Sequence, residues 1–247
     1  MKQYIITSSM GKRLIGIAMA EHPAIKQVLQ NGTLVIIAGS TNGYIAEEIL
    51  KKLGQADGFS RSGFRRGLNT PPGKNAPQVD FPGDVVIVNG TWLPGKTIFD
   101  VADELPTGDV VLKGANAFDA YDQAAVHINS TSGGTVMAAL SAVIGRRVRL
   151  IVPVGLEKRV FEDVNLIARI VNAPNSEGPR LLPLVGEVFT EIDALQYLTE
   201  VDAFLISAGG VYGAEGSVRL GIIGSPDEVE HASELIESVV GEPPCEV

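Results

Sequence analysis

Short apolar runs alternate with amphipathic stretches over the first two thirds of the chain. Four runs rich in Val, Ile and Leu are typical of strands covered on both faces, and they lie at 34–38, 85–88, 110–112 and 148–152. Amphipathic stretches before and between them predict helices at 9–30, 42–53, 97–105 and 135–144. We expect the first helix to bend or break near Pro23, and Gly54 to end the second. This order predicts an α/β fold, a parallel sheet with helices on both faces.

The pattern changes after about residue 175. The segments there follow the order strand, helix, strand, strand, helix, at 181–185, 191–198, 203–207, 218–223 and 226–240. Ser225 is expected to cap the last helix, which Pro226 opens. Because this order matches most of a ferredoxin-like unit, we predict a smaller α+β lobe over 176–247, beside an α/β domain over 1–175. The alternative is that these strands extend the first sheet.

The segment 55–83 is the least regular part of the chain. It holds four cations among Gly, Pro and Asn residues, namely Arg61, Arg65, Arg66 and Lys74. A loop of this length inside a compact domain is usually functional or disordered. In an acidic protein these clustered cations indicate a local anion site, in which we place Arg65 and Arg66. A solvated loop is the alternative.

The composition indicates a folded protein and narrows its partners. The chain has 247 residues, 45% of them hydrophobic, so it can bury a sizeable core and wholesale disorder is excluded. With 20 basic and 29 acidic residues the net charge is −9, so no nucleic-acid partner is expected. Cys245 is the only cysteine, which excludes an internal disulfide and a cysteine zinc cluster. The three histidines lack the spacing of a metal site, so we expect neither a metal nor a cofactor.

One segment near the start has some features of a signal peptide. Lys12 and Arg13 precede the apolar run 14–20. The run is short, Gly16 interrupts it, and its apolar residues continue at helical spacing beyond residue 20. No other run approaches the roughly 20 residues that cross a bilayer. We therefore expect a cytoplasmic protein without a membrane partner.

The first candidate for chemistry is the turn between the strand at 34–38 and the helix that follows. It consists of Gly39, Ser40, Thr41, Asn42 and Gly43. Glycine allows an oxyanion to approach the backbone closely, hydroxyl groups add donors, and the helix N-terminus favours negative charge. The turn therefore predicts a phosphate site. The alternative is an ordinary turn in which Thr41 or Asn42 caps the helix.

A second candidate is a literal match to the phosphate-binding loop of nucleoside triphosphatases. Residues 90–97 read GTWLPGKT, with a predicted strand before and a predicted helix after, and Lys96 and Thr97 would contact the nucleotide. Pro94 removes a backbone donor, however, and the following helix is short. No later apolar strand ends in an aspartate suited to Mg²⁺. We rank this hypothesis below the first.

The third candidate lies after the strand at 110–112. Polar residues gather there and in a later glycine turn, namely Lys113, Gly114, Asn116, Asp119, Gly133, Gly134 and Thr135. Ligands of open α/β sheets bind at the carboxyl ends of the strands, where these residues are expected. Lys113 follows a buried strand, so we expect it to pair with Asp119 or with a second anionic group of the ligand. His127 lies between two apolar residues and is expected to be buried.

Together these stretches resemble the ribose-5-phosphate isomerase superfamily. This class includes glucosamine-6-phosphate deaminase, DeoR-type regulators, CoA transferases and methylthioribose-1-phosphate isomerase. Its members open with a helix, a strand and a Gly/Ser/Thr phosphate loop, which here correspond to the helix from Lys12, 34–38 and 39–46. The stretch 113–119, KGANAFD, is similar to their GAD-type strand end, and the glycine turn at 133–135 follows in the same order. The resemblance covers about residues 10–155 without the insert 55–83, and ribose-phosphate isomerases also carry a C-terminal α+β lobe.

The departures from this pattern bear on catalysis. The isomerases carry aspartates at the strand end, where this chain has Lys113 and Asn116, and their glutamate base has no counterpart in the helix that begins at Thr135. Proton abstraction beside a carbonyl needs a base close to the substrate carbon. The candidate catalytic residues are therefore Asp119, Lys113 and Glu215, the last in the glycine-rich loop of the lobe.

Three hypotheses follow from the sequence. The first is a divergent isomerase- or transferase-like protein that binds a small phosphorylated ligand, a sugar phosphate. The second is a non-catalytic sensor of the same ligand, and the third is a nucleotide-binding protein that uses 90–97. Association with further copies of the chain is left open.

Overall fold

The computed structural model describes residues 1–66, 70, 72–73 and 80–244. Its centre is a six-stranded sheet, in the spatial order β10 (Glu187–Phe189), β8 (Arg149–Pro153), β5 (Val110–Leu112), β2 (Thr33–Ile36), β3 (Val85–Val88) and β4 (Thr91–Trp92). The first four are parallel, as predicted, whereas β3 runs antiparallel to β2 and β4 antiparallel to β3. The fold is therefore mixed α/β, and the predicted parallel sheet is confirmed in part, for four of its six strands.

A tight hairpin explains why β4 runs antiparallel to β3. Asn89 and Gly90 connect β3 to β4, and their φ angles are both positive, at 47° and 76°. Two such residues form the turn that matches the twist of antiparallel strands, and Asn-Gly is its most frequent sequence. β3 also runs antiparallel to β2, so the first residues of β3 lie at the carboxyl edge of β2.

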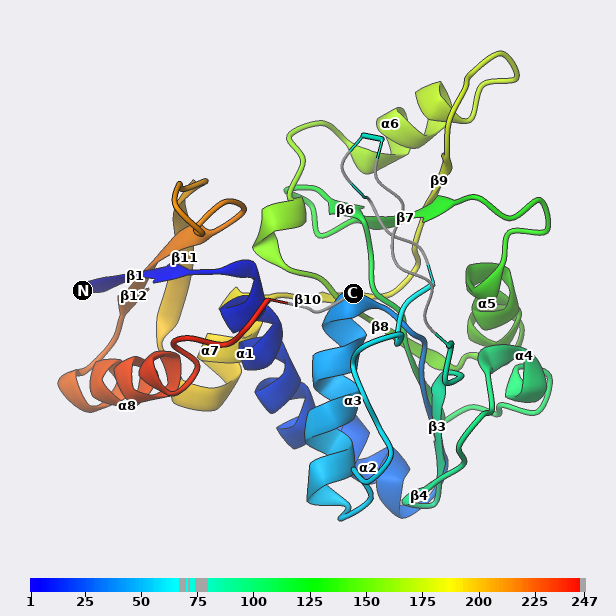
Figure 1. Cartoon of the computed structure of the whole chain (residues 1–247), viewed down its shortest axis with the longest axis horizontal. Helices are drawn as coiled ribbons and strands as arrows, with labels where there is room; N and C mark the ends of the chain where they lie inside the picture. The colour runs from blue at the N-terminus through cyan, green and yellow to red at the C-terminus, as the bar shows by residue number, and fades with distance from the viewer. Residues whose placement is uncertain (67–69, 71, 74–79, 245–247) are drawn as a thin grey trace.

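Helices cover the sheet on two sides. The central region contains α1 (Ser8–Glu21), α2 (Pro23–Gln30), α3 (Ser40–Lys52), α4 (Ile98–Val101) and α5 (Thr135–Arg146). Figure 1 shows α1 and α3 on one side of the sheet and α4 and α5 on the other. The predicted break near Pro23 is confirmed, since α1 ends before it and α2 starts at it. The predicted helix at 97–105 is reduced to the four residues of α4.

Two small sheets flank the central one. The first orders β1 (Lys2–Ile6), β12 (Val218–Ile223) and β11 (Asp202–Ala208), all antiparallel, with α7 (Glu191–Thr199) and α8 (Pro226–Ser238) packed against it. The second orders β6 (Ala117–Phe118), β7 (Ala124–Ile128) and β9 (Arg180–Pro183), beside α6 (Val164–Val171). The predicted capping of α8 by Ser225 is confirmed by a reciprocal capping box with Glu228.

The strand predicted at 181–185 does not belong to the C-terminal lobe, so the strand order expected for that lobe is wrong. We expected it to open the C-terminal unit, but β9 pairs antiparallel with β7 instead. The N-terminal strand β1, which the sequence pattern missed, takes the edge beside β12. Buried apolar residues of this lobe and of the central sheet belong to one continuous core. Among the helices of the described residues, none is long and apolar enough to cross a membrane.

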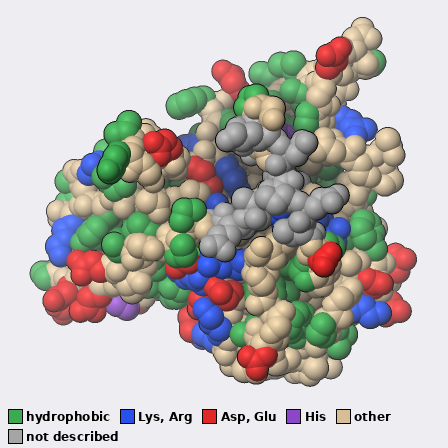
Figure 2. All heavy atoms as spheres, viewed as in Figure 1, with side chains coloured by type: hydrophobic (Ala, Val, Ile, Leu, Met, Phe, Trp, Pro, Cys, Tyr) green, Lys and Arg blue, Asp and Glu red, His purple; other side chains and the backbone are tan. Residues whose placement is uncertain are grey.

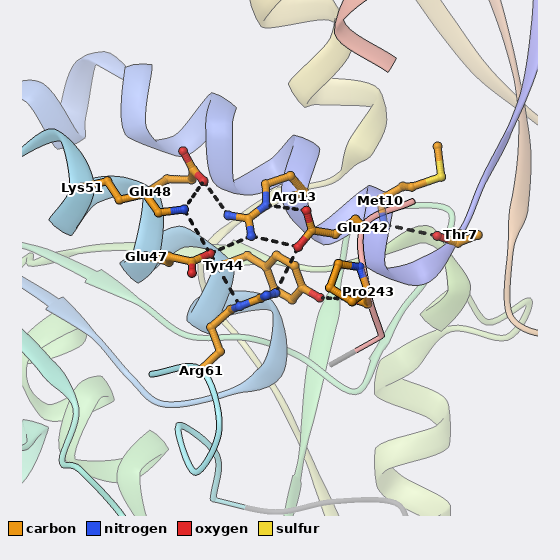
Figure 3. A network of polar contacts seen from close by, with 10 residues as sticks. All are labelled: Thr7, Met10, Arg13, Tyr44, Glu47, Glu48, Lys51, Arg61, Glu242 and Pro243. Atoms are coloured by element: carbon orange, nitrogen blue, oxygen red, sulfur yellow. Dashed lines mark hydrogen bonds and ion pairs between the residues drawn. The ribbon is translucent and has the colours of Figure 1, made fainter. Parts of the chain in front are cut away.

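A buried ion network holds the last part of the chain against α1 and α3 (Figure 3). The Arg13 guanidinium donates to Glu47, Glu48 and Glu242. Burial by itself would lower the pKa of Arg13, but the hydrogen bonds to Glu242 and Glu47 raise it above its ordinary value. Figure 2 shows basic and acidic side chains next to one another over α3, where this network lies.

Arg61 is part of the same network. Its guanidinium pairs with Glu47 and Glu242 and lies 4.0 Å from the centre of the Tyr44 ring. The Tyr44 hydroxyl in turn donates to the carbonyl oxygen of Pro243. Arg61 therefore has a structural role, and the expected cluster of four anion-binding cations is correspondingly smaller.

Candidate functional site

The turn at 39–42, the strand end at 113–116 and the glycine turn at 133–135 line one cavity of about 400 Å³, together with residues from the segment 55–83 and from α4. The predicted ligand residues in its wall are Gly39, Ser40, Thr41, Asn42, Arg66, Lys113, Gly114, Asn116, Gly133, Gly134 and Thr135. They come together because the carboxyl ends of β2 and β5 meet at one edge of the sheet, and the turn before α5 faces them. Lys74 lies outside the described residues, and Arg65 does not line this cavity.

The start of α3 leaves its backbone open toward the cavity. Gly39 has an extended backbone, with φ 176° and ψ 157°, so the conformation itself does not require glycine. No described atom lies within 4 Å of the place where a Cβ would sit. Glycine here therefore keeps free space in front of the backbone, which is what an approaching ligand needs.

No side chain caps α3, so the alternative of an ordinary capped turn is wrong. The amide of Asn42 donates instead to the carbonyl oxygens of Ile37 and Leu112, at 2.7 and 3.1 Å, and ties the ends of β2 and β5 together. Thr41 is only 2% exposed, and its hydroxyl has no hydrogen-bond partner among the described residues. A buried hydroxyl without a partner is costly, so this group is suited to a ligand atom.

Asp84 organises the edge of the cavity beside β3. Its buried carboxylate accepts from the backbone N–H groups of Ala38 and Ile98, both at 2.9 Å. It also accepts from the Nε and Nη2 atoms of Arg66, at 3.2 and 2.8 Å. The Arg66 guanidinium lies 4.4 Å from the centre of the Phe81 ring. Asp84 thus holds Arg66 in the cavity wall while it ties the end of β2 to the start of α4.

Two lysines reach the cavity from the ends of β5 and β8. Burial lowers the pKa of Lys113 to about 8; the charge of Asp84 opposes this, whereas the charges of Lys158 and Arg66 add to it. Burial also lowers the pKa of Lys158, with the charges of Glu157 and Glu191 acting in the opposite direction. Both ammonium groups are therefore held in an environment that penalises their charge.

The opposite wall is the turn before α5. Gly133 and Gly134 have φ angles of 81° and 65°, which glycine adopts without strain, and no side chain caps the helix that starts at Thr135. The Asn116 carbonyl oxygen accepts from the backbone N–H of His127 at 2.9 Å. His127 is exposed and lines the cavity, so the expectation of a buried histidine is wrong. Its side chain points to the face of β7 opposite to that of the buried Val126.

Neither predicted carboxylate lines the cavity. Asp119 accepts from the backbone N–H groups of Tyr121, Gln123 and Val164. Burial would raise the pKa of Asp119, but these hydrogen bonds hold it below its usual value. Asp119 thus organises its own turn and the start of α6, and the expected pair with Lys113 is absent.

Glu215, the second predicted carboxylate, is exposed in the loop between β11 and β12. It accepts from the backbone N–H of Gly213 at 2.9 Å, within the same loop.

The literal nucleotide-loop match forms a hairpin and a short helix. Gly90 belongs to the turn between β3 and β4, and Lys96 is exposed outside the cavity. The backbone N–H and the hydroxyl of Thr97 both donate to Asp100 at 2.7 Å. The next N–H, that of Ile98, donates to Asp84. These donors are therefore engaged within the protein.

Two residues at the candidate site were not predicted from the sequence, for different reasons. Lys158 follows β8 through a single turn, Leu156–Lys158, so a search for polar residues after every strand would have found it. Asp84 precedes β3, which places it at the site only because β3 is antiparallel. The Asn-Gly pair predicts that β3 and β4 are antiparallel, but it does not orient β3 relative to β2.

The arrangement suits an anion more than it suits a metal. Within the described part of the lining there is no Asp or Glu, whereas Arg66, Lys113 and Lys158 are present. No group of three or more His, Cys, Asp or Glu side chains in the described ranges could hold a metal ion. No protein-family model matches the chain, and no curated protein matches it either.

Proposed function

We propose that this protein binds a small phosphorylated ligand, a sugar phosphate, with the phosphate group at the N-terminus of α3. The observation that carries the proposal is the Thr41 hydroxyl, which is buried beside an uncapped helix N-terminus and has no partner among the described residues. A phosphate oxygen would accept from this hydroxyl and from the backbone N–H groups at the start of the helix.

The geometry around Gly39 supports the same assignment. The space in front of its backbone is open, so a phosphate oxygen can approach without displacing a side chain. The first turn of α3 carries no acidic residue, so the positive end of the helix dipole favours an anion at its start. The cavity of about 400 Å³ is large enough for a sugar attached to that phosphate.

We further propose that the chain is a divergent member of the ribose-5-phosphate isomerase superfamily. Support comes from the convergence of the phosphate loop, the KGAN strand end and the glycine turn on one cavity. Catalysis in this cavity cannot use the carboxylates of that superfamily, because this chain lacks them, or Asp119 and Glu215, because neither lines the cavity. Among the described lining residues, Lys113, Lys158 and His127 remain as groups that could transfer a proton.

The non-catalytic sensor is the second candidate, and the lack of a lining carboxylate in the described residues favours it over an isomerase. We expect isomerisation of ribose 5-phosphate to be slow or absent. Ready turnover that is lost in the Lys113→Ala protein would instead show that the lysine acts as the base.

Ligand binding is tested by thermal shift and calorimetry with ribose 5-phosphate and glucose 6-phosphate, against ribose and glucose as controls. The phosphorylated sugars should raise the melting temperature by mass action, and the free sugars should not. Gly39→Val places a side chain in the open space and should abolish binding without unfolding the protein, because no described atom obstructs it. Unchanged affinity in the Gly39→Val protein would remove this loop from the site.

A further inference from the structure

The cations of the cavity are distributed over several strand ends. Arg66 lies against Asp84 at the start of β3, Lys113 follows β5, and Lys158 follows β8. Neighbouring strands lie about 5 Å apart, and β8 is two strands away from β2, so the end of β8, which Lys158 follows, lies about 10 Å from the end of β2. One phosphate group at α3 is too small to contact the whole of this row.

The far lysines also lack a lining carboxylate that would neutralise them. Asp84 is engaged by Arg66 and by two backbone N–H groups, and the described lining carries no Asp or Glu; Glu157 and Glu191 act on Lys158 from outside it. Among the described residues, the Lys113 ammonium donates a single long hydrogen bond, 3.4 Å, to the carbonyl oxygen of its neighbour Gly114. Two like charges held together in a half-buried wall are unfavourable unless an anion joins them.

We infer that the ligand carries two anionic groups, a phosphate at α3 and a second carboxylate or phosphate at Lys113 and Lys158. This inference rests on the proposed function and narrows its substrate class to phosphorylated sugar acids and sugar bisphosphates. The two anionic groups of the ligand would contact different elements, so substitutions in the protein can test each group separately.

A proton balance supports the second subsite. The pKa of Lys113 is lowered to about 8, so part of the population has lost its proton near that pH. An anion placed against the ammonium favours the charged form and raises this pKa, so binding must take up protons at about pH 8. A ligand with a phosphate alone would leave the pKa of Lys113 closer to its unliganded value.

The matched probes are sorbitol 6-phosphate and 6-phosphogluconate, which share one carbon chain and differ only in an alcohol or a carboxylate at the far end. Comparison of sorbitol 1,6-bisphosphate with 6-phosphogluconate shows whether the second subsite prefers a phosphate or a carboxylate. Charge-assisted hydrogen bonds should make the two-anion probes bind about tenfold more tightly, or better, at low ionic strength. Calorimetry in Tris and in HEPES at about pH 8 should show proton uptake that is larger for the two-anion probes.

Lys158→Gln should reduce that preference to about one- to twofold, because one charge-assisted contact is lost, and should change the affinity for sorbitol 6-phosphate less than the affinity for the two-anion probes. Arg159→Gln is the matched control, because Arg159 is the next residue, carries the same charge and does not line the cavity. Melting temperatures of both variants report whether they fold. Equal affinities of the probes for the unmodified protein would overturn the second subsite and leave the proposed function standing. If no phosphorylated probe binds, both proposals fall.

Discussion

Removal of the charge of Asp84 should destabilise the protein more than the loss of a comparable surface ion pair. In Asp84→Asn, a single carbonyl oxygen replaces a carboxylate that accepts from two backbone N–H groups and from Arg66. One buried N–H group then loses its acceptor, which costs about 2 kcal/mol. The bond to Arg66 adds about 1 kcal/mol, because the Arg66 side chain is 29% exposed and its charge is partly screened.

The expected total is therefore a loss of about 3 kcal/mol in the free energy of unfolding. For a chain of this size such a loss lowers the urea midpoint by about 1 M and the melting temperature by about 6–12 °C. Urea denaturation followed by circular dichroism measures the midpoint. In the folded variant, the pKa of Lys113 should fall further, since the charge of Asp84 opposes its decrease.

Glu187→Gln is the matched control. Glu187 accepts from Arg149 with the same two-point geometry, at 2.8 and 2.7 Å, but the side chains are 56% and 43% exposed. Its loss should cost less than about 1 kcal/mol. Equal midpoints for the two variants would refute the argument that burial of the Asp84 carboxylate determines the cost.

Three further outcomes are expected. Lys96→Ala should change the free energy of unfolding, and the free energy of any Mg²⁺-dependent ATP binding, by less than about 0.5 kcal/mol, because Lys96 is exposed. Loss of ATP binding in this variant would make the nucleotide-loop hypothesis the leading one. Arg13→Met should lower the free energy of unfolding by about 3 kcal/mol and speed amide hydrogen exchange at Glu242, since it removes the buried guanidinium that binds this carboxylate together with Glu47 and Glu48; unchanged exchange would show that the network does not hold this segment. Burial, and to a smaller extent the charge of Glu157, raises the pKa of Glu191 from 4.5 to about 8. Between pH 4.5 and about 8 the folded state therefore binds one proton more than the unfolded state, and the free energy of unfolding falls as the pH rises through this range. Glu191→Gln removes this contribution, and its stability relative to the unmodified protein should rise between pH 5 and 8; a difference independent of pH would contradict the raised pKa.

Local patterns were enough to locate most elements that surround the cavity. Helical spacing of apolar residues predicted α3 and α5, and the apolar runs predicted β2 and β5, because each pattern reports burial within a few residues. The cap of α8 at Ser225 was equally local. Once β2 and β5 are parallel neighbours, Gly39 and Lys113 must meet at one edge, so the main part of the candidate site was within reach of the sequence.

Strand pairing was decided by the tertiary structure. The run at 85–88 reads the same in either direction, and only its pairing with β2 in the folded sheet placed β3 antiparallel to β2 and brought Asp84 to the cavity. Likewise β1 and β9 found partners far away in the chain, β12 and β7, which local periodicity does not encode.

The roles of individual polar residues also depended on the fold. Asp119 and Arg61 were plausible site residues by type, but nearby backbone N–H groups and carboxylates engage them. Lys158 acquired its place because β8 ends beside β5. A polar side chain binds whichever partner the packed chain brings within hydrogen-bond distance, and that partner is set by contacts between elements distant in the sequence.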